Sequence, residues 1–209
     1  MAKIDYKKDF KSLYIPKAIP MFIDIPKMTF ATLEGQGDPN LDEFALATQT
    51  LYALSYAVKM SYKSSMPPEG YYEYTVFPLE GVWDLVDKSK GIEDKSNLAY
   101  KIMIRQPDFL TPSLFHSFVA SLKLKKPELL WDFIKLEVIE EGQCCQMLHL
   151  GSYDQEPESF EKMEKFCSEN GVRRHSKLHR EIYLSDPRKT EASKLKTVLR
   201  FKIDKNEAY

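Results

Sequence analysis

The sequence predicts an α+β fold in which a β-α-β-β order of elements occurs twice. The first strand of each unit ends in a glycine-containing turn, at Gly35 and Gly37 in the first unit and at Gly151 in the second. The second strand of each unit carries a glutamate near its centre, Glu73 and Glu181. We therefore favour two pseudo-symmetric modules whose antiparallel sheets meet. The alternative is one irregular α+β sheet without internal duplication.

The chain divides into an N-terminal arm and one larger domain. Residues 1–27 contain Pro16, Pro20 and Pro26 among lysines and aromatic residues, which predicts an extended arm laid over the body. The domain that follows spans 28–209. Its first module covers about 28–110 and its second module about 135–209.

Hydrophobic periodicity and turn residues place the elements within each module. In the first module we expect a strand at 28–37, a helix at about 40–62, a strand at 71–85 with an irregularity at Pro78, a hairpin loop at 87–97 and a strand at 99–106. A second helix runs from about 112 to 126. In the second module we expect one or two strands within 135–153, a helix at 157–170, and strands at 179–186 and 196–203.

The composition argues against several classes of protein. The 209 residues are 43% hydrophobic and 29% charged, which is typical of a globular domain. The formal net charge is −1, so we expect no nucleic-acid partner. The sequence has no apolar run long enough for a membrane helix and no secretory signal, so we expect no membrane partner. The three cysteines make a poor disulfide framework, and we expect buried thiols in a cytoplasmic protein.

Motifs for nucleotide binding, zinc proteases and serine hydrolases are missing from the sequence. His175 and His179 are four residues apart, but in a strand such residues lie about 13 Å apart, too far for one metal ion to reach both. We therefore expect no metal ion and no cofactor. The basic run from Arg173 to Arg180 lacks a neighbouring helix-turn-helix pattern, and a solvated strand end explains it.

Glu181 and Tyr183 are the candidate catalytic residues. In a strand they share one face, while Ile182 between them points to the other. If their face lines a cleft, Glu181 could act as a general base on water, and Tyr183 could donate a hydrogen bond to a developing oxyanion. The alternative, which the spacing alone favours, is a glutamate on the solvated face of a sheet with Tyr183 covering it.

Trp83, Phe109 and His149 are the candidate ligand contacts. Flat apolar ligands need aromatic walls with a few polar groups that fix their orientation. Trp83 follows Gly81 near a strand end, where the rim of a cleft is expected, and Phe109 belongs to the same aromatic-rich half of the chain. His149 stands just before the Gly151 turn, where a structural histidine is the common alternative.

Several longer segments resemble a known family, the stand-alone GyrI-like small-molecule-binding proteins. These segments are, in order, FATLEGQGDPN, FPLEGVW, IRQPDF, EGQCCQMLHLGSYDQEP and HREIYLSDPRKTEASKLKTVLR. The family is related to the effector-binding domains of AraC-type and MerR-type transcription regulators. The resemblance implies two β-α-β-β modules in the SHS2 arrangement, with a ligand cleft between them.

The resemblance also implies a function. Its members bind flat, often cationic molecules, and some hydrolyse the cyclopropyl ring of cyclopropanoid genotoxins with a cleft glutamate and aromatic neighbours. Glu181, Tyr183 and Trp83 stand at the matching positions. The chain departs from the expected pattern at Arg180, where a second histidine is common, and at Asp84, where a second aromatic residue is common.

Three functions follow as hypotheses. The first is a cyclopropanoid cyclopropyl hydrolase in which Glu181 activates water and no cofactor is needed. The second is a non-catalytic module that binds and sequesters aromatic or cationic drugs. The third is a gyrase-interacting protein, which rests on the resemblance alone. The sequence does not indicate the oligomeric state.

Overall fold

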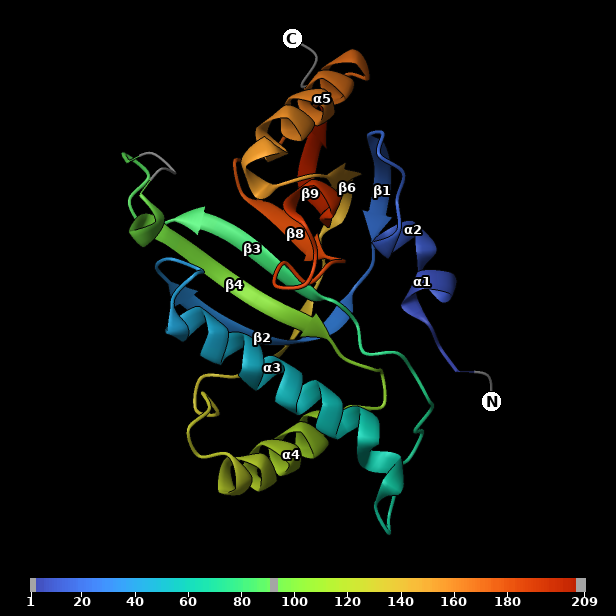
Figure 1. Ribbon diagram of the computed structural model, residues 1–209. Helices are drawn as coiled ribbons and strands as arrows, with labels where there is room; N and C mark the ends of the chain where they lie inside the picture. Colours follow the sequence, from blue (N-terminus) through green and yellow to red (C-terminus); the bar gives the residue numbers. More distant parts are fainter. Residues whose placement is uncertain (1–2, 91–93, 206–209) are drawn as a thin grey trace.

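The protein, seen in a computed structural model that describes residues 3–90 and 94–205, is built around one curled antiparallel sheet (Figure 1). Parts of the predicted arm (1–2), hairpin loop (91–93) and second module (206–209) lie outside the described residues. The strand order is β1-β6-β9-β8-β3-β4-β2-β5, and β7 pairs with β9. The strands are β1 Met21–Ile25, β2 Met28–Gln36, β3 Leu79–Leu85, β4 Leu98–Arg105, β5 Lys135–Ile139, β6 Gly142–Leu150, β7 Val172–Arg174, β8 His179–Tyr183 and β9 Lys196–Lys205.

Helices lie on both modules and on the arm. The helices are α1 Tyr6–Asp9, α2 Lys11–Tyr14, α3 Asp42–Met60, α4 Pro112–Lys125 and α5 Glu156–Glu169. Capping residues explain several of these ends. The Thr111 side chain accepts a hydrogen bond from the backbone N–H of Leu114, and Pro112 takes the first position of α4. Gly171 adopts a positive φ directly after α5, as a helix C-terminus favours.

The predicted pair of β-α-β-β modules is confirmed. The first consists of β2, α3, β3 and β4, and the second of β6, α5, β8 and β9. The two modules meet where β3 pairs with β8, in the middle of the sheet, with Gly81 directly opposite Glu181. The sheet orders on the two sides of this junction mirror each other, so the junction lies on a pseudo-twofold axis.

The outer strands exchange partners between the modules. β1 leads directly into β2 along the chain, yet it pairs with β6 of the second module. Likewise β5 leads into β6 but pairs with β2 of the first module. The β1–β2 segment and the β5–β6 segment therefore each contribute one strand to both halves of the sheet. The sequence analysis missed β1, because its flanking prolines predict an irregular arm instead.

The predicted strand at 71–85 is too long. The ladder begins only at Leu79, after Pro78, which has no backbone N–H to donate. The segment before it is extended, and Tyr74 makes only an isolated bridge to Ile4. Glu73 therefore lies outside β3, and its carboxylate forms an ion pair with Lys3. The expected equivalence of Glu73 and Glu181 is wrong, because Gly81 holds the position opposite Glu181.

Helices α3 and α5 cover the same face of the sheet on opposite sides of the junction. Phe44 of α3 stacks on Trp83, with ring centroids 5.8 Å apart. Phe160 of α5 contacts the ring of His179 edge-on at 4.8 Å. Because Trp83 and His179 are direct cross-strand partners, their side chains share a face. Figure 1 shows the two helices on either side of β3 and β8, with α4 packed against α3 below it in the view.

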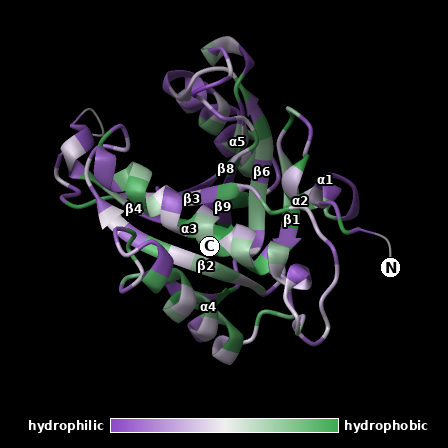
Figure 2. Ribbon diagram, turned by 60° about the horizontal axis from the view of Figure 1, so that its bottom comes forward, coloured by the Kyte–Doolittle hydropathy of each residue, from purple (hydrophilic) through white to green (hydrophobic). Residues whose placement is uncertain are grey.

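The hydropathy of the elements matches these layers. Strands β1 and β6 are mainly hydrophobic in Figure 2, whereas α5 alternates between hydrophobic and hydrophilic residues. The apolar side of α5 packs Met163 and Cys167 against Met147 and Leu199 of the sheet. The three cysteines are free and buried, as predicted. In the parts of the chain that the structure describes, no helix has both the length and the apolar character needed to cross a bilayer.

The opposite face of the sheet holds a buried ion network. Arg180 donates to Glu80 at 2.7 Å, and its Nε lies 3.0 Å from Glu141. Arg200 donates to the same Glu141 carboxylate at 3.0 Å and to the backbone carbonyl of Leu13 at 2.8 Å. The N-terminal arm is thereby tied to this face. Burial works to raise the pKa of Glu141, but the positive charges of the two arginines outweigh it and lower that pKa.

This network predicts the pH dependence of stability. A lowered carboxyl pKa stabilises the fold above the ordinary value of 4.5, and the contribution is lost as the pH falls through the lowered pKa. We expect Glu141→Gln to reduce the free energy of unfolding by about 3 kcal/mol at pH 7. The difference from the wild type should shrink toward pH 3. Urea unfolding at several pH values measures both, and a pH-independent difference would contradict the assignment.

Candidate functional site

Strand β8 presents three polar side chains on the helix-covered face, at the junction of the modules. His179, Glu181 and Tyr183 alternate with Arg180 and Ile182, which point to the other face. The alternation follows the prediction for Glu181 and Tyr183. Arg180 belongs to the buried ion network behind the sheet, so its departure from the family pattern does not change the helix-covered face.

A hydrogen bond across the junction joins Trp83 to Tyr183. The indole Nε1 donates to the Tyr183 hydroxyl oxygen at 2.7 Å. This bond passes over Gly81, where a Cβ atom would lie 3.0 Å from both the indole nitrogen and the hydroxyl. Phe44 and Tyr100 pack against the indole, with centroids 5.8 and 5.7 Å away. The structure thus brings Trp83 together with the two candidate catalytic residues.

Glu181 is buried, with 8% of its surface exposed, and accepts a hydrogen bond from Tyr183. Burial, the negative charge of Glu181 and that hydrogen bond raise the pKa of Tyr183 well above its ordinary value. Tyr183 therefore keeps its proton, donates it toward Glu181 and accepts from Trp83. On another side of the carboxylate, the Nε2 of His179 lies 3.0 Å from Oε1 of Glu181.

Glu156, the first residue of α5, brings a second carboxyl group to the site. Burial, the charge of Glu181 and a hydrogen bond to Glu181 raise the pKa of Glu156 to about 10. At neutral pH Glu156 therefore keeps its proton. The sequence analysis missed Glu156, because an acidic residue at a helix N-terminus is common and its spacing does not reveal burial.

Tyr153, also missed, closes the site on the side of α5. Its ring meets the ring of Tyr183 edge-on at 6.2 Å. Burial and the negative charges of Glu181, Glu156 and Asp186 raise the pKa of Tyr153 to about 12. The aromatic residue just before α5 therefore stays a neutral hydrogen-bond donor near the carboxyl pair.

His149 has a positioning role. Its Nε2–H donates to the backbone carbonyl of Ser152 at 2.9 Å, since a carbonyl can only accept. The Ser159 hydroxyl donates to Nδ1 at 2.9 Å. Both ring nitrogens are thus used within the protein, and they tie the end of β6 to the start of α5. That contact fixes the turn that carries Glu156.

Phe109 lies in a different cluster, so the structure does not bring it to this site. Its ring packs among Tyr71, Tyr72 and Tyr74 at 5.1, 5.4 and 6.2 Å. Tyr71 donates to the backbone carbonyl of Lys59 at the C-terminal end of α3, whereas Phe44 near the other end contacts Trp83. At about 1.5 Å per helical residue the two clusters are roughly 20 Å apart.

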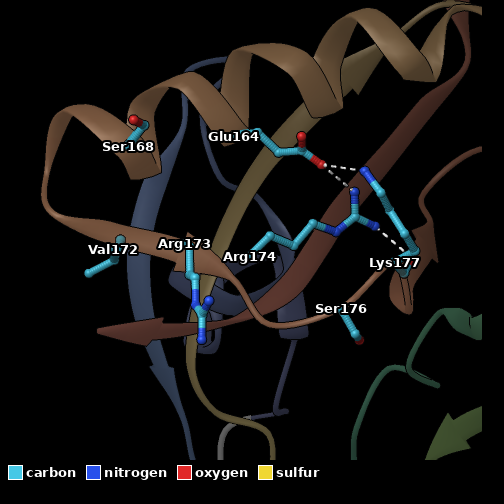
Figure 3. A pocket seen from close by; sticks show the side chains of 7 residues that line it. All are labelled: Glu164, Ser168, Val172, Arg173, Arg174, Ser176 and Lys177. Atoms are coloured by element: carbon cyan, nitrogen blue, oxygen red, sulfur yellow. Dashed lines mark hydrogen bonds and ion pairs between the residues drawn. The ribbon is translucent and has the colours of Figure 1, made fainter. Parts of the chain in front are cut away.

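Two surface hollows lie beside the second module. One of about 390 Å³ lies between α5 and β7 (Figure 3). There the Glu164 carboxylate accepts hydrogen bonds from Arg174 at 2.9 Å and Lys177 at 3.3 Å, so its main charges are already paired. The other, of about 380 Å³, lies mainly over the opposite face of the sheet, where Glu141, Arg180 and Arg200 of the ion network line it. His179 also borders this hollow.

The sequence profile of the GyrI-like small molecule binding domain matches residues 20–204. The chain belongs to this family. The match spans both modules and starts just before β1, so the GyrI-like domain includes the strand exchange as well as the junction. Among curated proteins, none matches this chain.

Several solved structures are similar to this GyrI-like chain. A protein described as an uncharacterized conserved protein from Listeria innocua is 38% identical, with a TM-score of 0.91, over 97% of this chain and 100% of that one. A protein described as a hydrolase from Listeria innocua is 36% identical, with a TM-score of 0.89 and the same coverage. The EcmrR C-terminal domain shares the fold, at 14% identity and a TM-score of 0.53, over 89% of this chain and 97% of that one.

The hydrogen bond over Gly81 can be tested by removing one hydroxyl. Tyr183→Phe leaves the partly buried indole N–H of Trp83 without its acceptor, so we expect a loss of about 1–3 kcal/mol in the free energy of unfolding. The matched control is Tyr56→Phe on the exposed surface of α3, which should change stability by less than about 0.5 kcal/mol. Denaturant unfolding measures both, and equal effects would show that the bond contributes nothing.

Proposed function

We propose that the protein binds flat polycyclic or amphipathic small molecules at the module junction and hydrolyses the cyclopropyl ring of cyclopropanoid compounds. The observation that carries this proposal is the buried Glu181 side chain, which lies beside the buried Glu156 and next to the Tyr183–Trp83 hydrogen bond. The relative described as a hydrolase, at 36% identity over nearly the whole chain, supports a hydrolytic reaction.

Aromatic side chains provide the binding surface. Trp83 is partly exposed and is held in place by Phe44 and Tyr100, while Tyr153 and Tyr183 stand on the other side of the junction. Aromatic rings favour offset stacking and edge contacts with flat ligands. A planar molecule laid against Trp83 would therefore reach toward Glu181.

The proposed reaction adds one water to the strained ring. Glu181 takes a proton from water as the water oxygen bonds to a cyclopropane carbon. The ring C–C bond breaks, and its electron pair moves into the conjugated carbonyl of the ligand. The proton then returns to the product. Positioning, a base and ring strain supply the rate.

Two neutral donors can stabilise the negative charge that develops on the ligand. Burial and the charge of Glu181 raise the pKa of Glu156 to about 10, and the pKa of Tyr183 is raised well above its ordinary value. Both remain protonated at neutral pH, so each can donate a hydrogen bond to an oxyanion. This role adds Glu156 to the predicted pair of catalytic residues.

A non-catalytic binding module is the second candidate, and the burial of Glu181 favours it equally. A buried carboxylate with aromatic neighbours can serve as the counter-charge for an organic cation. In that case the ligand is sequestered unchanged.

We place the protein in the cytoplasm under either function, on the basis of its three free, buried cysteines.

Glu181→Gln separates the two candidates. The amide keeps the shape of the side chain but cannot take a proton, so we expect hydrolysis to fall by about 10²–10⁴-fold. Affinity for a neutral cyclopropanoid should change by only a few fold. Mass spectrometry of the product, heavier by one water, measures turnover, and quenching of tryptophan fluorescence measures binding.

Glu164→Gln is the matched control, since Glu164 is a partly exposed carboxylate in the hollow beside α5. It should hydrolyse at the wild-type rate. Unchanged compound bound to both the wild type and Glu181→Gln would support the sequestering module. Normal turnover by Glu181→Gln would exclude Glu181 as the base.

A further inference from the structure

Three metal-ligating side chains converge at the module junction. One ligand atom each from Glu156, His179 and Glu181 lies within 4.8 Å of the others. We infer that these three residues form a binding site for one divalent transition-metal ion, such as Zn²⁺ or Mn²⁺. The inference does not depend on the proposed hydrolysis, because ion binding can be measured without any small-molecule ligand.

The spacing of the donor atoms suits a single ion. Two ligand atoms bound at about 2.1 Å and at right angles are roughly 3.0 Å apart. The Nε2 of His179 and the Oε1 of Glu181 are separated by 3.0 Å. Glu156 approaches from the N-terminus of α5, so the three ligands come from two elements, and its ligand atom lies within 4.8 Å of the other two.

The orientation of His179 directs its Nε2 at Glu181. Its Nδ1 lies 3.3 Å from the backbone carbonyl of Lys177, which can only accept, so Nδ1 carries a hydrogen. The Nε2 is left to face Oε1 of Glu181 at 3.0 Å, in a hydrogen-bonded pair whose proton a metal ion would replace. A backbone carbonyl that fixes the far nitrogen is the usual outer partner of a metal-bound histidine.

Glu156 supplies independent support. It is only 6% exposed, and its Oε1 is buried without a hydrogen-bond partner. A buried, unpartnered carboxyl oxygen is costly, and coordination to a cation would satisfy it. Metal ligands must be deprotonated, so a bound ion would displace the proton from Glu156. No positive side chain competes from the same strand at Arg180, which is directed to the opposite face.

The surrounding side chains hold the proposed ligands in place and leave room for a further ligand. Tyr183 holds the Glu181 carboxylate, and Phe160 holds the imidazole edge-on. Three protein ligands with open positions are typical of metal sites that also bind water or substrate. Carboxylate and imidazole donors suit Zn²⁺ and Mn²⁺.

The test is calorimetric titration of the chelator-treated full chain with ZnCl₂ and MnCl₂. We expect one ion per chain. Glu156→Gln and His179→Gln should each weaken binding at least about 10-fold, as the loss of one ligand requires. The matched control Glu164→Gln, on the same helix as Glu156, should bind like the wild type. Equal affinities in all four proteins, or no ion bound to the wild type, would overturn the site.

Folding of the variants is checked by their thermal unfolding before titration. A second measurement needs no variant, namely X-ray absorption of the zinc-loaded wild type. It should show only nitrogen and oxygen ligands, one of them imidazole, whereas a sulfur ligand would overturn the assignment to these residues. A protein that hydrolyses a cyclopropanoid but binds no ion contradicts the metal site alone. A protein that binds the ion but hydrolyses nothing supports the site and contradicts the hydrolase.

Discussion

The antiparallel pairing of β3 with β8 is the constraint on which the rest of the structure depends. It joins the two modules into one sheet and sets Gly81 opposite Glu181. Because Gly81 has no side chain, the bond between Trp83 and Tyr183 can cross the junction above it. Without that register the carboxyl group, the phenol and the indole would stand on separate modules with no common surface.

Strand β8 separates two groups of charged side chains, one on each face of the sheet. Arg180 points into a network in which every glutamate has an arginine partner, and this network anchors the N-terminal arm. Glu181, one residue later, points to a face where a second carboxyl group, two phenols and an imidazole surround it. Paired charges thus lie on the ion-network face of the sheet, where they stabilise the fold. The carboxyl groups without a cationic partner in the network lie on the helix-covered face, where a ligand or an ion can bind them.

Most of the fold could be predicted from the sequence, because local patterns determine it. The helices α3, α4 and α5 and the strands around them follow periodicity, caps and turn glycines within a few residues. The β1–β6 and β2–β5 pairings could not be predicted, since no local pattern tells a strand which distant partner it takes.

At the site, the shared face of Glu181 and Tyr183 followed from alternation alone. Glu156 and Tyr153 did not, because their place beside Glu181 depends on how the start of α5 packs against β8, and Phe109 was misplaced because aromatic residues also fill cores.

The exchange of the outer strands has a consequence for the origin of the chain. Each module takes its last strand from the segment that precedes the other, as two identical subunits do when they swap an end strand. The architecture is thus that of a domain-swapped homodimer fused into one polypeptide. After fusion, the two copies can acquire different residues at equivalent positions. One could keep a glycine at the symmetry axis while the other acquired a glutamate, an asymmetry that a true homodimer can never place on its own axis.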